Sequence, residues 1–81
     1  DFGASFKVYP NPTSGNLKID LGKVYNGITV KVFNALGQVV INELYGSMDE
    51  INIEIEGTPG MYILEIQTEA GKSARVNVIK E

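Results

Sequence analysis

This chain of 81 residues contains no cysteine, so it has no thiol nucleophile, and its serine and threonine hydroxyls are the candidates for nucleophilic hydrolysis. It contains no histidine either, so it lacks the usual general base near neutral pH and the commonest transition-metal ligand. Hydrolysis by a hydroxyl nucleophile needs an adjacent base. The composition therefore argues against an enzyme that uses any of Ser5, Thr13, Ser14, Ser47 and Ser73.

Two further sets of side chains could in principle bind a ligand. Asp49 and Glu50 lie close to Asn52 and offer oxygen ligands for calcium, but they lack the spaced ligands of a calcium-binding loop, so a solvated turn is the favoured interpretation. Tyrosines offer stacking surfaces for a sugar when two or three exposed rings share one face, although Tyr62 is expected in the core. The tyrosines are Tyr9, Tyr25, Tyr45 and Tyr62. We expect neither a metal nor another cofactor.

The charges are unevenly distributed along the chain. A net charge of −3 and a pI of about 4.8 argue against a nucleic-acid-binding protein. Residues 32–71 contain seven acidic residues and no lysine or arginine, and all seven basic residues lie outside that range. Cross-strand ion pairs between the two sets are one interpretation. The other is a pair of opposed patches that orient the domain on a partner. No apolar run approaches the roughly 20 residues that span a membrane.

Alternation of apolar and polar residues runs through most of the sequence and predicts strands with one face in a core and one in water. No segment shows helical periodicity over two turns. Less regular segments at 5–9 and 38–44 bring the expected number of strands to about seven, and YGSMDE at 45–50 is expected to be a loop. The clearly alternating segments are LKIDL (17–21), ITVKVF (28–33), INIEIE (51–56), YILEIQ (62–67) and ARVNVIK (74–80).

The connections between these segments predict tight hairpins. Gly37 and Gly71 each follow three residues that fit a type I turn, so each glycine is expected to adopt a positive φ. Short strands with turn signals at roughly 8–12-residue spacing predict an all-β fold, an immunoglobulin-like antiparallel β-sandwich of about seven strands. A small barrel is the alternative, and a single open sheet would leave one apolar face bare. The predicted core consists of Leu17, Ile19, Val30, Val32, Ile53, Ile55, Tyr62, Leu64, Ile66, Val76 and Val78.

One turn, VYPNPTSGN at residues 8–16, is rich in residues that restrict the backbone or allow it unusual conformations. Each proline lacks a backbone donor and favours extended geometry in the residue before it. Pro10 is therefore expected to end the first strand, and Pro12 to set a turn that continues through Gly15 and Asn16 into the next strand. A rigid corner between two strands is a sufficient interpretation and needs no ligand.

Nearly the whole chain, from Val8 to Lys80, resembles a known family, because it contains four of that family's motifs in the family's order. They are a YPNP-x-x-G turn, an asparagine-x-x-glycine hairpin after a strand, a G-x-Y-x-L strand start, and a lysine after the last hairpin glycine followed by a basic final strand. The sequence resembles the carboxy-terminal sorting domain of type IX secretion cargo, the Por secretion tail. The matching residues are Tyr9, Pro10, Asn11, Pro12 and Gly15; Asn34 and Gly37; Gly60, Tyr62, Leu64 and Ile66; and Lys72, Arg75 and Lys80. It departs from the family at the terminal Glu81 and at Arg75, where lysine is common.

The resemblance implies an address rather than an enzyme. Residues 1–5 would be a linker remnant of the preceding cargo, and residues 6–81 the sorting domain. Cargo of this family crosses the inner membrane, folds in the periplasm and leaves through an outer-membrane translocon that works with a shuttle protein. A sortase-like cysteine peptidase at the surface typically removes the tail, with residues 1–5 as the expected neighbourhood of the cut. The cargo is then anchored at the surface or set free.

The motifs also supply the candidates for partner recognition. If the final strand lies at a sheet edge, its free backbone groups offer pairing to a partner strand, although lysine on an edge more often prevents such pairing. A carbohydrate-binding module and a spacer domain of a surface protein stay open as other functions. The candidate recognition residues are Tyr9, Pro10, Asn11, Pro12, Gly15, Gly37, Gly60, Tyr62, Lys72, Arg75 and Lys80.

Overall fold

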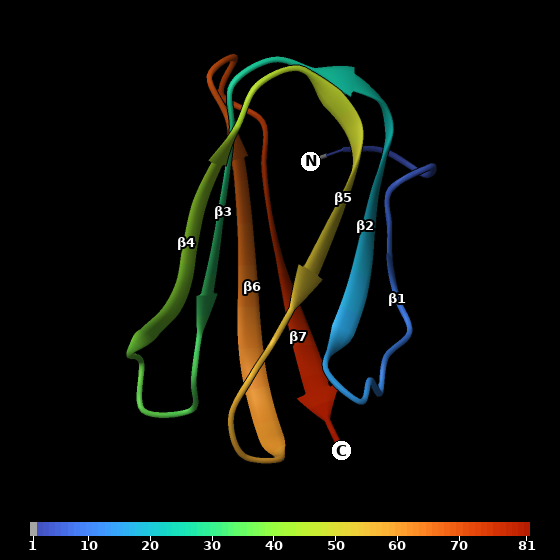
Figure 1. Cartoon of the computed structure of the whole chain (residues 1–81). Coiled ribbons are helices and arrows are strands. Elements are labelled where there is room, and N and C mark those ends of the chain that lie inside the picture. The colour runs from blue at the N-terminus through green and yellow to red at the C-terminus, as the bar shows by residue number, and fades with distance from the viewer. Residues whose placement is uncertain (1) are drawn as a thin grey trace.

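Seven strands make up most of the chain in the computed structural model, which describes residues 2–81 (Figure 1). The first residue of the expected linker, Asp1, lies outside the described residues. The predicted loop at 45–50 is wrong except at residues 46 and 47. Tyr45 ends one strand by pairing with Ile28, and Met48 pairs with Tyr25 and so begins a strand that already contains Asp49 and Glu50. The strands are β1 (Lys7–Tyr9), β2 (Asn16–Tyr25), β3 (Ile28–Phe33), β4 (Val39–Tyr45), β5 (Met48–Glu54), β6 (Gly60–Thr68) and β7 (Ser73–Lys80).

The strands form two antiparallel sheets packed face to face. One sheet has the order β1-β2-β5 and the other the order β4-β3-β6-β7. This arrangement is that of an immunoglobulin-like sandwich, in which the third, sixth and seventh strands share a sheet opposite the first, second and fifth. The predicted fold is confirmed. The small-barrel alternative is wrong, because the strands are divided between two sheets.

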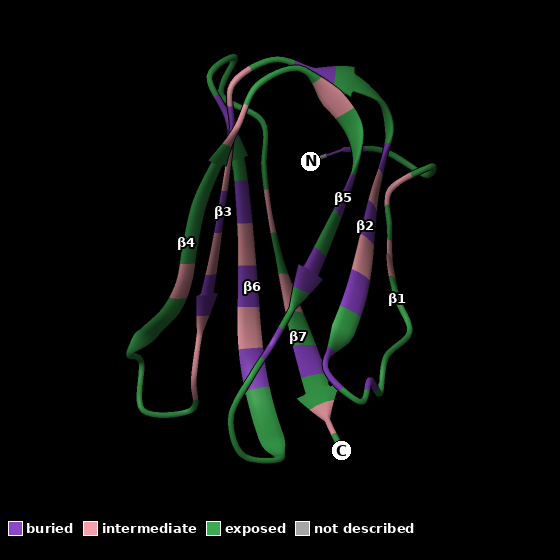
Figure 2. Ribbon diagram, in the orientation of Figure 1, coloured by how far each residue is buried: buried purple, intermediate pink, exposed green. Residues whose placement is uncertain are grey.

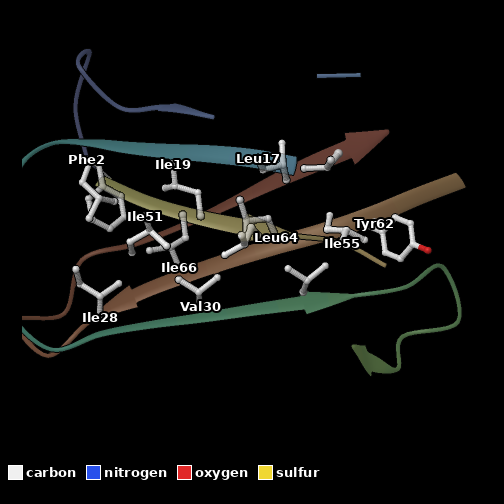
Figure 3. Close-up of a cluster of buried hydrophobic side chains, with 14 of the residues drawn as sticks. Phe2, Leu17, Ile19, Ile28, Val30, Ile51, Ile55, Tyr62, Leu64 and Ile66 are labelled. Carbon is white, nitrogen blue, oxygen red and sulfur yellow. The ribbon is translucent and has the colours of Figure 1, made fainter. Parts of the chain in front are cut away.

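The core lies between the sheets and follows the alternation along β2, β3, β5 and β6 (Figures 2 and 3). The inward side chains of β3, Ile28, Val30 and Val32, are completely buried. Every predicted core residue is buried except Val76 in the edge strand β7, which is only partly buried. Phe2, in the segment expected to be a linker, is 7% exposed and packs into the same core.

The two hairpin glycines adopt the expected backbone conformation. Gly37 has a φ of 83° and Gly71 a φ of 93°. Each N–H donates to the carbonyl three residues earlier, at 2.9 Å to Asn34 and 3.0 Å to Thr68. A residue with a Cβ is strained at such a φ, so these positions close the β3–β4 and β6–β7 hairpins because they are glycines.

Candidate partner-recognition site

The turn that connects β1 to β2 lies against the outer edge of β7, although the two are far apart in sequence. The Asn11 side chain bridges two backbone groups of β7: its Nδ2 donates to the Asn77 carbonyl at 2.9 Å, and its Oδ1 accepts from the Ile79 N–H at 3.0 Å. The backbone of Thr13 continues the pairing, since its N–H donates to the Ile79 carbonyl at 2.9 Å and its carbonyl accepts from the Glu81 N–H at 2.8 Å. The Asn11 amide thus replaces a peptide group of a neighbouring strand. The first and last motifs of the sequence are joined by these hydrogen bonds.

Thr13 and Gly15 hold this turn in shape. The Thr13 side chain is 1% exposed; its hydroxyl donates to the Asn16 carbonyl and accepts from the Gly15 N–H at 3.0 Å. Gly15 has a φ of 140°, and a Cβ there would stand 3.0 Å from the Ile55 carbonyl oxygen. Pro10 directly follows the last residue of β1. The strand-to-strand corner predicted from the prolines is therefore present, and it is fixed at both the turn and the β7 edge.

The start of β6 lies beside the end of β7. Tyr62 is 5% exposed, as expected for a core position, and its hydroxyl donates to the Thr58 carbonyl at 2.7 Å. A tyrosine near the start of this strand that bonds to upstream backbone is a recurring feature of immunoglobulin-like sandwiches. Gly60 is the cross-strand neighbour of Lys80, and the Lys80 Nζ donates to the Gly57 carbonyl at 3.1 Å. The last lysine is thus tied to the loop before β6.

Most of the candidate recognition residues meet at one end of the sandwich, which we call the signature end. It comprises the turn at 10–15, the β3–β4 hairpin at 34–37, the segment 57–62 and Lys80. Figure 1 shows these loops and the chain's carboxyl end at the same end of the molecule. A shallow cavity of about 170 Å³ lies between residues 34–36 and 58–62. The structure therefore brings the first three motifs together with the end of the fourth.

Lys72 and Arg75 do not join the signature end. Lys72 follows the Gly71 turn, and Figure 1 shows that β7 runs from that turn along the length of the sandwich. The Arg75 Nε lies 3.4 Å from a carboxylate oxygen of Glu65, its cross-strand neighbour on β6. A second ion pair joins Lys18 and Glu50 at 3.5 Å. Cross-strand pairs therefore neutralise part of the acidic span, and as partly exposed pairs they add little stability.

The tyrosines do not form a stacking face. Tyr25 and Tyr62 are buried, Tyr45 is partly buried, and Tyr9 is 44% exposed. Burial raises the pKa of the Tyr45 phenol, and the nearby Glu43 carboxylate raises that pKa further. The several exposed tyrosines on one face that a sugar-binding module needs are not found among residues 2–81.

The described part of the chain offers no group of three or more acidic side chains placed to hold a metal ion. Asp49 and Glu50, the oxygen ligands considered for calcium, instead lie in β5, where Glu50 forms its ion pair with Lys18. No helix within residues 2–81 has the length and apolar character that a membrane span requires.

Comparison with known proteins agrees with the motifs and the topology. The family described as the secretion system C-terminal sorting domain matches residues 7–80. The chain belongs to this family. A crystal structure of a DUF3244 family protein from Bacteroides vulgatus, described as an immunoglobulin-like β-sandwich, is similar with a TM-score of 0.80 and 21% identity over 95% of this chain and 85% of that one. At that identity the likeness shows the fold alone. No curated protein matches the sequence.

The family match confirms the resemblance that the four motifs indicated. The domain is a type IX C-terminal sorting signal. A sorting tail implies a secretion system that reads it, a cargo on its amino side, and delivery to the cell surface or the extracellular space.

Sequence reasoning missed two structural residues, Thr13 and Phe2. Thr13 occupies an unspecified position of the YPNP-x-x-G motif. A small polar residue in a turn often bonds to nearby backbone, and this was the one sequence feature that indicated its role. Phe2 belongs to no alternating segment, so no pattern indicated its burial.

Proposed function

We propose that the secretion machinery recognises the signature end as one composite surface. The observation that supports this is the bridge from Asn11 and Thr13 to β7. These residues occupy the outer edge of β7 from Asn77 to Glu81, so a partner that approaches the end of the final strand also meets the YPNP turn. The exposed candidates at this end of the sandwich are Tyr9, Pro10, Asn11, Pro12, Gly37 and Gly60.

In this proposal the partners are the type IX outer-membrane translocon and its shuttle protein, which meet the folded tail after transit through the periplasm. A sortase-like cysteine peptidase then removes the tail in the neighbourhood of residues 1–5, and the cargo is anchored or released. Phe2 stacks on Phe6 with ring centroids 5.1 Å apart and forms a T-shaped pair with Tyr25, with ring centroids 5.0 Å apart. A cut after Phe2 would therefore remove a core side chain from the tail, whereas a cut before Phe2 leaves the sandwich complete.

Two matched lysine substitutions test the composite surface. The tail is fused to a periplasm-targeted reporter in a host that has the secretion system. Lys80→Gln removes a charge at the signature end together with its contact to Gly57, and Lys72→Gln removes the same charge at the far end of β7. We expect the Lys80 variant to leave reporter in the periplasm and the Lys72 variant to be exported like the wild type.

Thermal unfolding of the isolated tails separates recognition from folding, because a variant with an unchanged melting temperature has lost only surface chemistry. The triple variant, with Lys72, Arg75 and Lys80 all changed to glutamine, is expected to be trapped as the Lys80 variant is. Equal export of both single variants would contradict recognition at the signature end. A wild-type tail that exports no reporter would contradict sorting by this chain in that host.

A further inference from the structure

The four-stranded sheet has two edges, and they differ in how they are covered. The outer edge of β7 is bridged by Asn11 and Thr13 over its last residues. The other edge is β4, which pairs with β3 and with no second strand (Figure 1). Natural sheets usually protect an open edge with lysine, proline, a bulge or an inward-pointing charge within the strand. β4 contains neither lysine nor proline, and its pairing irregularity lies at its start, opposite Phe33. That irregularity leaves Val40 without a cross-strand partner, and from Ile41 to Tyr45 the edge is regular and open.

The inward row of β4 side chains contains one carboxylate, Glu43, and is only partly covered. Ile41, Glu43 and Tyr45 stand opposite the core residues of β3, yet none of the three is fully buried. A groove of about 240 Å³ separates them from Asn52, Ile53 and Glu54 of β5. Within residues 2–81, neither Glu43 nor Glu54 has an ion-pair partner. A strand placed beside β4 would therefore bring its inward side chains next to uncompensated carboxylates.

The outward row of β4 side chains is mostly apolar. Val40 is 42% exposed and Leu44 is 79% exposed, with Asn42 between them. Figure 2 shows β4 as mostly exposed, in contrast to the alternating burial of β3 and β6. Because cross-strand neighbours on one face interact in pairs, a strand added to β4 gains most with apolar side chains outward and basic side chains inward.

We propose that β4 binds an extended polypeptide segment in which apolar residues alternate with lysine or arginine, as a fifth strand of this sheet. Main-chain hydrogen bonds supply affinity in such an addition, and the alternating side chains supply selectivity. The segment belongs to a separate partner chain rather than to a second copy of this one. The basic, alternating strand of this chain is β7, and its outer edge is already occupied from Asn77 to Glu81.

Binding of a synthetic peptide to the 81-residue chain tests the proposal. The probe is a peptide of the length of β4 in which lysine and valine alternate, and the comparison peptide has glutamate in place of lysine. Resonances of the isotopically labelled domain are followed by NMR together with amide hydrogen exchange. We expect the lysine peptide to shift the resonances of β4. It should also slow hydrogen exchange of the β4 amides that point away from β3, and leave β7 unchanged. The glutamate peptide is expected to bind at least about tenfold more weakly.

A matched pair of charge reversals tests the site. Glu43→Lys places the charge change in the groove, and Glu81→Lys makes the same change after the opposite edge strand. Both positions are exposed, so both variants should fold. Only Glu43→Lys is expected to weaken binding of the lysine peptide, by about tenfold.

Equal binding of the two peptides, equal effects of the two variants, or resonance shifts centred on β7 would overturn the proposal. No binding of either peptide would overturn it as well. Shifts in β4 that appear with rising protein concentration alone would assign the edge to a second copy of the chain and also overturn it.

Discussion

Removing the Asn11 side chain should destabilise the fold through one identifiable contact. Asn11→Ala deletes two hydrogen bonds to β7, one to the Asn77 carbonyl and one from the Ile79 N–H. A hydrogen bond contributes a net ~0.5–1.5 kcal/mol, and these are exposed, so water replaces part of each one. We expect the free energy of unfolding to fall by about 1–2 kcal/mol. For a domain of this size each kcal/mol corresponds to roughly 4–8 °C in melting temperature.

The matched control for this prediction is Asn77→Ala. It makes the same side-chain change on the strand that Asn11 contacts, but the group used there is the Asn77 backbone carbonyl, so the bridge stays intact. Denaturant unfolding gives the two free energies, and hydrogen exchange reports on the Ile79 amide. We expect faster Ile79 exchange in the Asn11 variant alone. Equal destabilisation by both substitutions, or an unchanged Ile79 amide, would refute the reasoning.

Three further measurements check the core, a hairpin and a shifted ionisation. Leu64→Ala should cost about 2–5 kcal/mol because Leu64 is completely buried, and a near-zero change at the 84% exposed Leu36 is the comparison. Gly37→Ala should cost roughly 1–2 kcal/mol from backbone strain, since its φ is 83° and nothing crowds the position. Gly46→Ala, in equally open space without a positive φ, should cost less. The Tyr45 phenol should ionise at higher pH than an exposed tyrosine, mainly because burial disfavours the phenolate. Because its folded pKa is raised, this contribution to stability is complete below the unfolded pKa and is lost as pH rises through the folded one, which absorbance and unfolding titrations follow.

The sequence predicts the strands well where one face is buried throughout. Along β3, alternation of Ile28, Val30 and Val32 with polar neighbours leaves one possible inward face, since a shift of one residue would expose the whole set. The prediction is poorer at β4, where Val39, Val40 and Ile41 are all apolar and most of the strand proves to be exposed. Edge position decides burial there, and no local pattern encodes it.

Contacts between distant segments are the part that sequence patterns do not predict. The motifs include both Asn11 and Lys80, but nothing in their spacing indicates that Asn11 pairs with a strand 66 residues away. The prediction of a loop at the start of β5 was wrong for a related reason. Met48 is extended because Tyr25 of β2 reaches it across an irregularity in the ladder, and MDE alone carries no strand signal.

The hydrogen bonds from Asn11 and Thr13 to β7 give the first sorting motif a structural role in this domain. Asn11 and the end of β7 close an edge that would otherwise be open, so the same residues protect the fold and form the proposed recognition surface. A substitution at Asn11 therefore lowers stability and alters that surface together, and a loss of export cannot be assigned from Asn11 alone. Lys80→Gln separates the two effects better, because it leaves the backbone pairing of Thr13 with Ile79 and Glu81 in place. If the Lys80 variant stays folded and is retained, recognition needs the side chains of the signature end in addition to a closed sheet edge.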